Sequence, residues 1–308
     1  MNERMGKEDT TMKYPLGRLL TGVMLMALCL GSGVAAQTIV VGGKAFTEQQ
    51  IMTAMTVALL KAKGFTPDRK AGMGSAAVRA AMENGQVDVY WEYTGTGLGV
   101  FNKITDKFAS AEDAYKKIKE VDAAKGIVWL NMSAVNNTYG FAMNRDEAQK
   151  RGLVTMSDLA KAIKGGAKLT FASNAEFYAR PDGLPGWQTA YGFEFERDNV
   201  KRMDTGLTYA ALKDRQVDSA VVFATDGRIP AFNFVVLKDD RNYAAPYNLT
   251  PVVRKEVLDK NPKLAEALNA LAAKLNDDNI AKLNASVDVD KKSVEEVAEG
   301  FLKANGLI

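Results

Sequence analysis

Residues 80–88, Ala80-Ala81-Met82-Glu83-Asn84-Gly85-Gln86-Val87-Asp88, recur at 210–218 as Ala210-Ala211-Leu212-Lys213-Asp214-Arg215-Gln216-Val217-Asp218. The same distance beyond each copy stands an aromatic residue, Tyr93 or Phe223. Each copy has the pattern of a helix, a tight turn, a buried strand and a loop at the strand's carboxyl end. Such units resemble one another in many α/β proteins by coincidence. Here the identical Ala-Ala and Gln-Val-Asp residues are separated by the same number of positions, which favours a true repeat. The repeat therefore predicts two similar lobes.

The order of the predicted elements indicates an α/β fold. Strand and helix signals alternate from residue 38 to 230, whereas the last part of the chain is helical, with apolar spacing at Leu264, Leu268 and Leu271. Ligands of open α/β sheets bind beyond the carboxyl ends of the strands. If two lobes face each other across a cleft, Tyr93 and Phe223 converge in it.

Composition argues against several kinds of chemistry. The 308 residues include 40 Lys and Arg, 37 Asp and Glu, one Cys and no His. The chain therefore lacks the commonest metal ligand and general base, and it can form neither an intrachain disulfide nor a Cys-based zinc site. A formal charge of +3 is too small to indicate a nucleic-acid-binding surface. We expect no catalysis, cofactor, metal or nucleic-acid partner, although an enzyme using Asp or Glu with Lys is an alternative.

The first 36 residues have the pattern of a cleavable signal peptide. Lys13 and Arg18 precede an apolar run at 19–30, and small residues follow up to Ala36. The run is short for a membrane span. Cys29 is not preceded by a small residue, which favours cleavage after Ala36 over a lipoprotein site. We expect a periplasmic protein, since a mature chain without Cys suits that compartment.

Two basic residues are candidates for binding an anion. Lys44 follows a Gly pair at a predicted strand end, and Thr47 and Gln50 form a capping-box pattern that predicts a helix start just beyond it. Arg180 lies in a loop with two prolines, which suits a fixed guanidinium that binds a carboxylate. The alternatives are an exposed structural Lys and a solvated surface Arg.

Aromatic residues at predicted loop positions are candidates for binding a cation. Four of them stand beside turn residues or hydroxyl donors: Tyr93, Tyr139, Phe223 and Tyr247. Each alone is more simply explained by packing. Together they could form a box for a cation without N–H donors, because aromatic faces attract cations within ~6 Å, at roughly 0.5–2 kcal/mol per ring.

Six segments carry a resemblance to a known family. In chain order they are 42–49, 87–96, 136–139, 182–186, 225–228 and 246–248. Together they resemble the glycine betaine/choline/carnitine class of substrate-binding proteins of ABC transporters, in the osmoprotectant branch. The resemblance covers essentially the whole chain after residue 37 and implies a type II periplasmic-binding fold with a ligand cleft between two lobes. We expect residues 37–136 and 231–308 to form the first lobe and 137–230 the second.

The resemblance also implies a set of ligand-binding residues. In the family an aromatic cage holds a trimethylammonium group, and the matching positions are Tyr93, Tyr139, Phe223 and Tyr247. The carboxylate contacts match Lys44, Thr96 and Arg180. The chain departs from the family at Phe223, where Tyr is usual, and at Asn137, where some members carry Asp.

The resemblance implies transport. A small quaternary amine would be the ligand, a membrane-bound ABC permease the partner, and a monomer the simplest state. We rank glycine betaine above choline because choline would leave Lys44 and Arg180 without a counter-charge. The alternatives are choline, another cationic amine or an amino acid, for which Glu92 or Asp226 would be the acidic partner. A sensor function is a further alternative.

Overall fold

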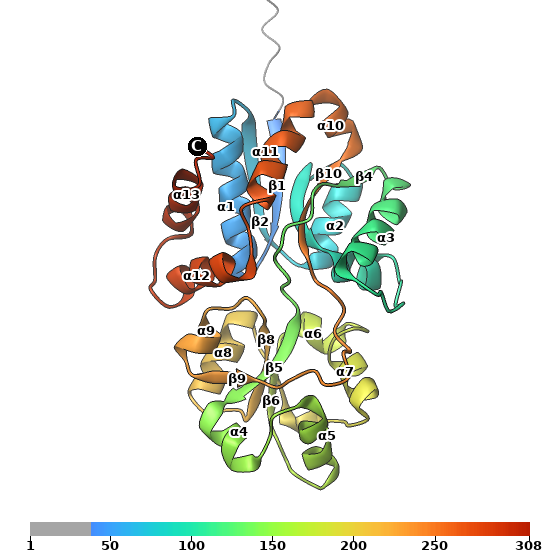
Figure 1. Cartoon of the computed structure of the whole chain (residues 1–308), viewed down its shortest axis with the longest axis vertical. Helices are drawn as coiled ribbons and strands as arrows, with labels where there is room; N and C mark the ends of the chain where they lie inside the picture. The colour runs from blue at the N-terminus through green and yellow to red at the C-terminus, as the bar shows by residue number, and fades with distance from the viewer. Residues whose placement is uncertain (1–37) are drawn as a thin grey trace, which may run out of the picture. The chain divides into compact units, whose positions relative to one another are not determined.

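The computed structural model describes residues 38–308, which form two five-stranded sheets (Figure 1). The strands of the first sheet are, in order, β2 (Thr66–Met73), β1 (Thr38–Lys44), β3 (Val89–Tyr93), β10 (Leu249–Arg254) and β4 (Ile127–Trp129). Those of the second are β7 (Val200–Arg202), β6 (Phe171–Ser173), β8 (Ser219–Phe223), β5 (Tyr139–Asn144) and β9 (Phe234–Val236). The predicted signal peptide and Cys29 lie outside the described residues.

The two sheets have the same topology. In the first, β1 is parallel to β2 and β3, and β10 runs antiparallel between β3 and β4. In the second, β6 is parallel to β7 and β8, and β5 runs antiparallel between β8 and β9. The α/β fold with two lobes, expected from the sequence, is confirmed.

The sequence repeat forms equivalent elements in both sheets. Helix α2 (Ser75–Glu83) leads into β3, and α8 (Thr205–Lys213) leads into β8. The turn after each helix places one residue at positive φ, Gly85 (φ 73) and Arg215 (φ 58). The Asp that ends each copy accepts a hydrogen bond from the backbone of a neighbouring segment, Asp88 from Val40 and Asp218 from Thr170. The repeat in the sequence therefore corresponds to a repeated unit in the structure.

The chain crosses between the sheets twice, after β4 and before β10 (Figure 1, green and orange). The two crossing segments run side by side, with hydrogen bonds from the Asn137 amide to the Tyr247 carbonyl and from the Leu249 amide to the Val135 carbonyl. The expected return to the first lobe at residue 231 is too early. Because β9 pairs with β5, the second sheet continues to Val236 before the chain returns.

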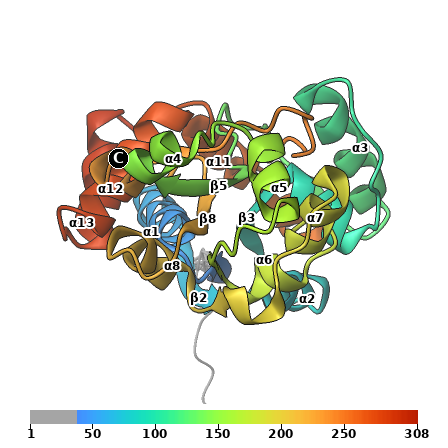
Figure 2. The ribbon, with the colours of Figure 1, turned by 90° about the horizontal axis from the view of Figure 1, so that it is seen from below.

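Each sheet is covered by its own helices, and Figure 2 shows those of the second sheet around β5 and β8. The first sheet packs with α1 (Thr47–Ala62), α2, α3 (Ala111–Ala123), α10 (Lys255–Lys260), α11 (Pro262–Ala272), α12 (Asp277–Asp288) and α13 (Val294–Ala304). The second packs with α4 (Arg145–Arg151), α5 (Met156–Lys164), α6 (Ala175–Ala179), α7 (Leu184–Tyr191), α8 and α9 (Arg228–Ala231). A π-helical turn, η1 (Thr96–Phe101), follows β3, and a short 3-10 turn, η2 (Arg197–Asn199), precedes β7.

The C-terminal helices belong to the core of the first sheet. Leu264, Leu268 and Leu271 of α11 are fully buried, and Leu302 of α13 joins the same apolar cluster. Burial of each such side chain contributes about 1.5–3 kcal/mol, which fixes the helical tail on this lobe. Among residues 38–308, no helix is long and apolar enough to span a bilayer, and no group of three or more His, Cys, Asp or Glu is arranged to hold a metal ion.

Candidate functional site

A cavity of about 600 Å³ lies where the ends of both sheets meet the crossing segments. Its size falls within the roughly 300–1,000 Å³ typical of small-molecule sites. All eight residues singled out from the sequence line it: Lys44, Tyr93, Thr96, Asn137, Tyr139, Arg180, Phe223 and Tyr247. The structure thus brings the predicted residues together in one place.

Five aromatic rings form a continuous group along the cavity. The Phe223 ring stacks on Phe46 with centroids 5.0 Å apart and lies 5.2 Å from Tyr139. Tyr139 meets Tyr247 edge-on at 5.7 Å, and Phe46 lies 6.3 Å from Tyr93. Sequence reasoning missed Phe46, although it stands directly between the strand that ends at Lys44 and the first helix.

Strand register explains why these rings converge. Tyr93 ends β3 and Phe223 ends β8, the equivalent strands of the two sheets. Tyr139 begins β5 directly opposite Phe223. Tyr247 lies in the returning segment just before β10, and a Cβ atom on Gly95 would approach its ring to 2.6 Å. Glycine at position 95 is therefore required for Tyr247 to occupy this place.

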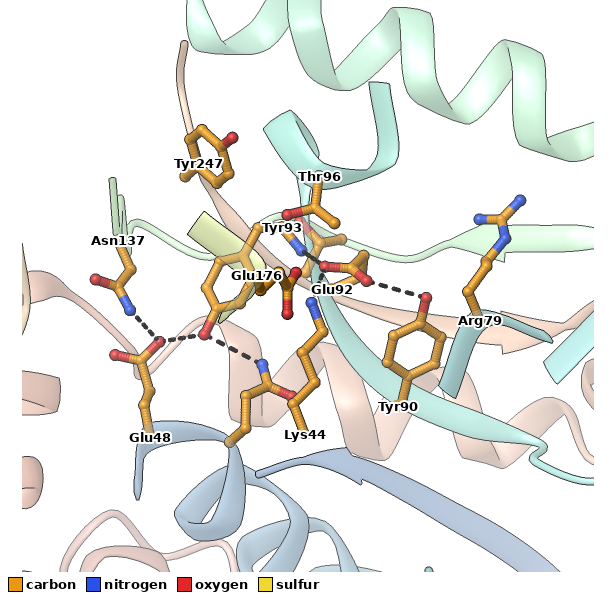
Figure 3. Close-up of polar contacts among 12 residues, drawn as sticks. Lys44, Glu48, Arg79, Tyr90, Glu92, Tyr93, Thr96, Asn137, Glu176 and Tyr247 are labelled. Carbon is orange, nitrogen blue, oxygen red and sulfur yellow. Dashed lines mark hydrogen bonds and ion pairs between the residues drawn. The ribbon is translucent and has the colours of Figure 1, made fainter. Parts of the chain in front are cut away.

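Lys44 is buried and already neutralised. Its Nζ lies 2.5 Å from Glu92 Oε1, with both side chains almost inaccessible to solvent, and 5.1 Å from the centroid of the Tyr93 ring. Glu92 also accepts hydrogen bonds from the Tyr93 amide and the Tyr90 hydroxyl (Figure 3). The ammonium group thus lies beside the aromatic group with a counter-charge of its own.

Arg180 contacts both the aromatic rings and acidic residues of its own segment. Its guanidinium forms a two-point ion pair with Asp182, at 2.8 and 2.7 Å, and contacts Glu176 at 3.1 Å. Its carbon lies 5.3 Å from the centroid of the Tyr139 ring and 5.8 Å from that of Tyr247. Burial alone would raise the pKa of Asp182, but hydrogen bonds and charge from Arg180 outweigh it and hold that pKa below its ordinary value.

Thr96 and the phenol hydroxyls provide polar atoms close to this guanidinium. Arg180 Nη1 lies 3.2 Å from the Tyr139 hydroxyl, and Nη2 lies 3.0 Å from that of Tyr247 and 3.4 Å from Thr96 Oγ1. Burial raises the pKa of both phenols, so each is a neutral hydroxyl. The Tyr247 hydroxyl donates to Asp182, whereas the Tyr139 hydroxyl accepts from Arg180 and can donate to a ligand. A ligand carboxylate placed here would meet several hydrogen-bond donors at once.

Asn137 shares a buried carboxylate that sequence reasoning missed. Its side-chain amide donates to Glu48 Oε1 at 3.0 Å (Figure 3), and its carbonyl oxygen accepts from the Thr225 amide. Glu48 also accepts from Tyr93 and Thr225, so it links three walls of the cavity. Burial raises the pKa of Glu48 despite these hydrogen bonds. The sequence signal that could have identified Glu48 is its position in the first turn of a predicted helix, close to Lys44.

The two acidic residues considered as partners for an ammonium ligand are both engaged. Glu92 pairs with Lys44, and Asp226 binds Arg228 through both carboxylate oxygens at 2.9 and 2.6 Å. Glu92 does not line the cavity, and the Asp226–Arg228 pair lies at its side. The structure thus offers neither carboxylate as a free acceptor for an amino acid's ammonium group.

Two sheets of equal topology, joined by two adjacent crossing segments and enclosing a polar and aromatic cavity, define a two-lobed solute-binding protein. The chain belongs to the OpuAC family, the substrate-binding domain of ABC-type glycine betaine transport systems, whose profile matches residues 37–304. It is therefore a substrate-binding protein of an ABC transporter.

Known relatives agree along nearly the whole chain. The chain is 41% identical over 298 residues to the glycine-betaine-binding protein of Pseudomonas aeruginosa, covering 92% of this chain and 96% of that protein. It is 32% identical to the glycine betaine-binding protein YehZ of Escherichia coli, covering 95% and 99%. A crystal structure of a glycine betaine/carnitine/choline ABC transporter protein aligns with a TM-score of 0.70 and 29% identity, covering 87% and 99%.

Proposed function

We propose that the cavity captures a quaternary-ammonium compatible solute of the glycine betaine type. The observation that carries this proposal is the group of rings from both lobes around one cavity: Tyr93, Tyr139, Phe223 and Tyr247, with Phe46 beside them. A trimethylammonium group is a cation without hydrogen-bond donors, so ring faces stabilise it without leaving donors unpaired. Each ring contributes about 0.5–2 kcal/mol.

The carboxylate of the ligand is proposed to bind at Lys44, Thr96 and Arg180, beside Asn137. The guanidinium and the Thr96 and Tyr139 hydroxyls that accept from it support this assignment, because each of these hydroxyls can still donate to a carboxylate. Both basic residues have internal counter-charges, Glu92 and Asp182, so a ligand without a carboxylate leaves neither cation unpaired. The sequence-based argument against choline therefore loses its force, and we propose choline as a second ligand.

Capture is proposed to be a conformational event and not a reaction. A solute that contacts both lobes binds the closed form more tightly and shifts the population toward it. The first lobe would comprise 37–136 and the C-terminal helices, and the second 137–230 extended through β9. The closed form would deliver its solute to an inner-membrane permease as a periplasmic monomer, after removal of residues 1–36. A receptor in place of the permease would make the same protein a sensor.

Calorimetric titration of residues 37–308 tests this function. The protein is unfolded and refolded first, to remove ligand carried through purification, and then titrated with glycine betaine, choline, carnitine and a neutral amino acid. We expect saturable heats with the quaternary amines and none with the amino acid, and each solute should be recovered unchanged. A protein that binds only the amino acid, or that converts the solute, would contradict the proposal.

A further inference from the structure

The Glu48 carboxylate is among the most enclosed charged groups beside the cavity. It is 2% exposed and lies in the first turn of α1. Four side chains donate to it: the Tyr93 hydroxyl at 2.6 Å, Asn137 Nδ2 at 3.0 Å, Thr225 Oγ1 at 2.6 Å and Asn284 Nδ2 at 3.3 Å. These donors come from β3, a crossing segment, the loop after β8 and α12.

Both oxygens of Glu48 accept hydrogen bonds, Oε1 from Tyr93 and Asn137 and Oε2 from Thr225 and Asn284. The Tyr93 hydroxyl accepts from Gln49 Nε2 at 3.2 Å, so its own proton is directed to Glu48. The Asn137 amide is oriented by the bond that its carbonyl accepts from the Thr225 amide. An ionised carboxylate only accepts, which matches this arrangement. Although burial raises the pKa of Glu48, the surrounding donors stabilise its charged form.

No Lys or Arg in residues 38–308 forms an ion pair with this carboxylate, whereas Lys44 is satisfied by Glu92. Figure 3 shows Glu48 on the side of the Tyr93 phenol away from the cluster around Glu92. Its other oxygen binds Thr225, which follows Phe223 in the second lobe. The Glu48 carboxylate, which has no basic partner among the described residues, is therefore hydrogen-bonded to one ring of the aromatic group, Tyr93, and contacts segments of both lobes.

We propose that Glu48 is the counter-charge of the aromatic cage, a positioning residue that aligns Tyr93 with the Phe223 loop and favours a cationic over a neutral ligand. This inference rests on the proposed function. By accepting a hydrogen bond from the Tyr93 hydroxyl, the carboxylate polarises the phenol, which makes the ring face more attractive to a cation. Glu48 would thus supply, through its hydrogen bonds to Tyr93 and Asn137, the negative charge that an Asp at position 137 would bring.

Other charged groups face Glu48 from neighbouring elements. Asp226 and Arg228 lie at the start of α9, and Asp288 lies at the end of α12, where it accepts from the Thr47 hydroxyl. Arg228 pairs with both of these carboxylates, at 2.6 and 3.4 Å. Burial also raises the pKa of Asp288, so a pH profile must be compared between variants and not read from the wild type alone.

The test uses two ligands of the same shape and different charge. Glycine betaine carries a trimethylammonium group, and 3,3-dimethylbutanoate carries a tert-butyl group in its place, with the same carboxylate. We expect Glu48→Gln to weaken glycine betaine at least tenfold in calorimetric titration at neutral pH, and to change the affinity for 3,3-dimethylbutanoate by less than about threefold. The affinity of the wild type for glycine betaine should fall as pH is lowered through the pKa of Glu48, and this dependence should be absent in Glu48→Gln.

Glu295→Gln is the matched control, since it removes a carboxylate from an exposed ion pair with Arg69 and should leave both affinities unchanged. If Glu48→Gln does not fold, Tyr93→Phe breaks the same coupling while keeping the ring, and the same selective loss is expected. Equal loss of both ligands, or no loss of glycine betaine, would overturn the inference alone. A wild type that binds no quaternary amine would overturn the proposed function and this inference with it.

Discussion

Replacing Arg180 with Met should separate carboxylate recognition from cation recognition. The change removes a guanidinium that lies over the Tyr139 and Tyr247 rings and beside the Thr96 hydroxyl. A hydrogen bond to a charged group contributes about 1.5–3 kcal/mol, which corresponds to roughly 10- to 150-fold in affinity. Because Asp182 and Glu176 already compete for this guanidinium, we expect the lower end of that range for glycine betaine.

Choline provides the internal comparison in this experiment. It has the same trimethylammonium group and no carboxylate, so Arg180→Met should change its affinity by less than about threefold, or tighten it by freeing the ring faces. Arg202→Met is the control variant, because the Arg202 guanidinium lies 5.0 Å from the centroid of the Tyr178 ring and neither residue lines the cavity. Equal losses for both ligands, measured by calorimetric titration, would refute the separation of the two subsites.

Three further changes test other parts of the structure. Tyr247→Ala should weaken glycine betaine at least tenfold, or ~1.4 kcal/mol, because a cage ring is lost, and an unchanged Kd would count against the cage. Phe223→Tyr should leave the affinity level or tighten it, since the ring face is kept and a hydroxyl is added; clear weakening would mean that the pocket is shaped for another group. Asp122→Asn should lower the free energy of unfolding by about 1.5–3 kcal/mol, because it removes the two-point ion pair of buried Arg79 and leaves that guanidinium only its pair with the exposed Glu83 carboxylate. Burial would raise the pKa of Asp122, but Arg79 lowers it below its ordinary value. The stability that Asp122 contributes is therefore present above the pKa it has in the unfolded chain, and it is lost as pH falls through its pKa in the folded protein. Equal melting temperatures of the wild type and Asp122→Asn at neutral pH would contradict this prediction.

The repeat made the fold readable from sequence because each copy carries a complete local unit. A helix, a tight turn and a buried strand were all visible as residue types. The positive φ in each turn and the hydrogen bond from a neighbouring segment to each Asp were seen only in the structure. The position of the second crossing was not visible, because β9 is only three residues long and pairs with β5 far away in sequence. Short strands of this kind are defined by their partners.

The site was predictable where a residue type identifies its chemistry and unpredictable where pairing decides its state. Aromatic residues at predicted loop positions indicated the cage, and the structure places all four around one cavity. The pairing of Lys44 with Glu92 could not be inferred from spacing, because it depends on the register between β1 and β3. Thr47 was expected to cap a helix, but its hydroxyl donates to Asp288, far along the chain.

The most direct test of the central claim is a crystal structure of residues 37–308 grown with glycine betaine. We predict the ligand nitrogen among the rings of Tyr93, Tyr139, Phe223 and Tyr247, within ~6 Å of their centroids, and the carboxylate beside Lys44, Thr96 and Arg180. A ligand whose nitrogen lies outside this group of rings, or a ligand bound outside this cavity, would contradict the account.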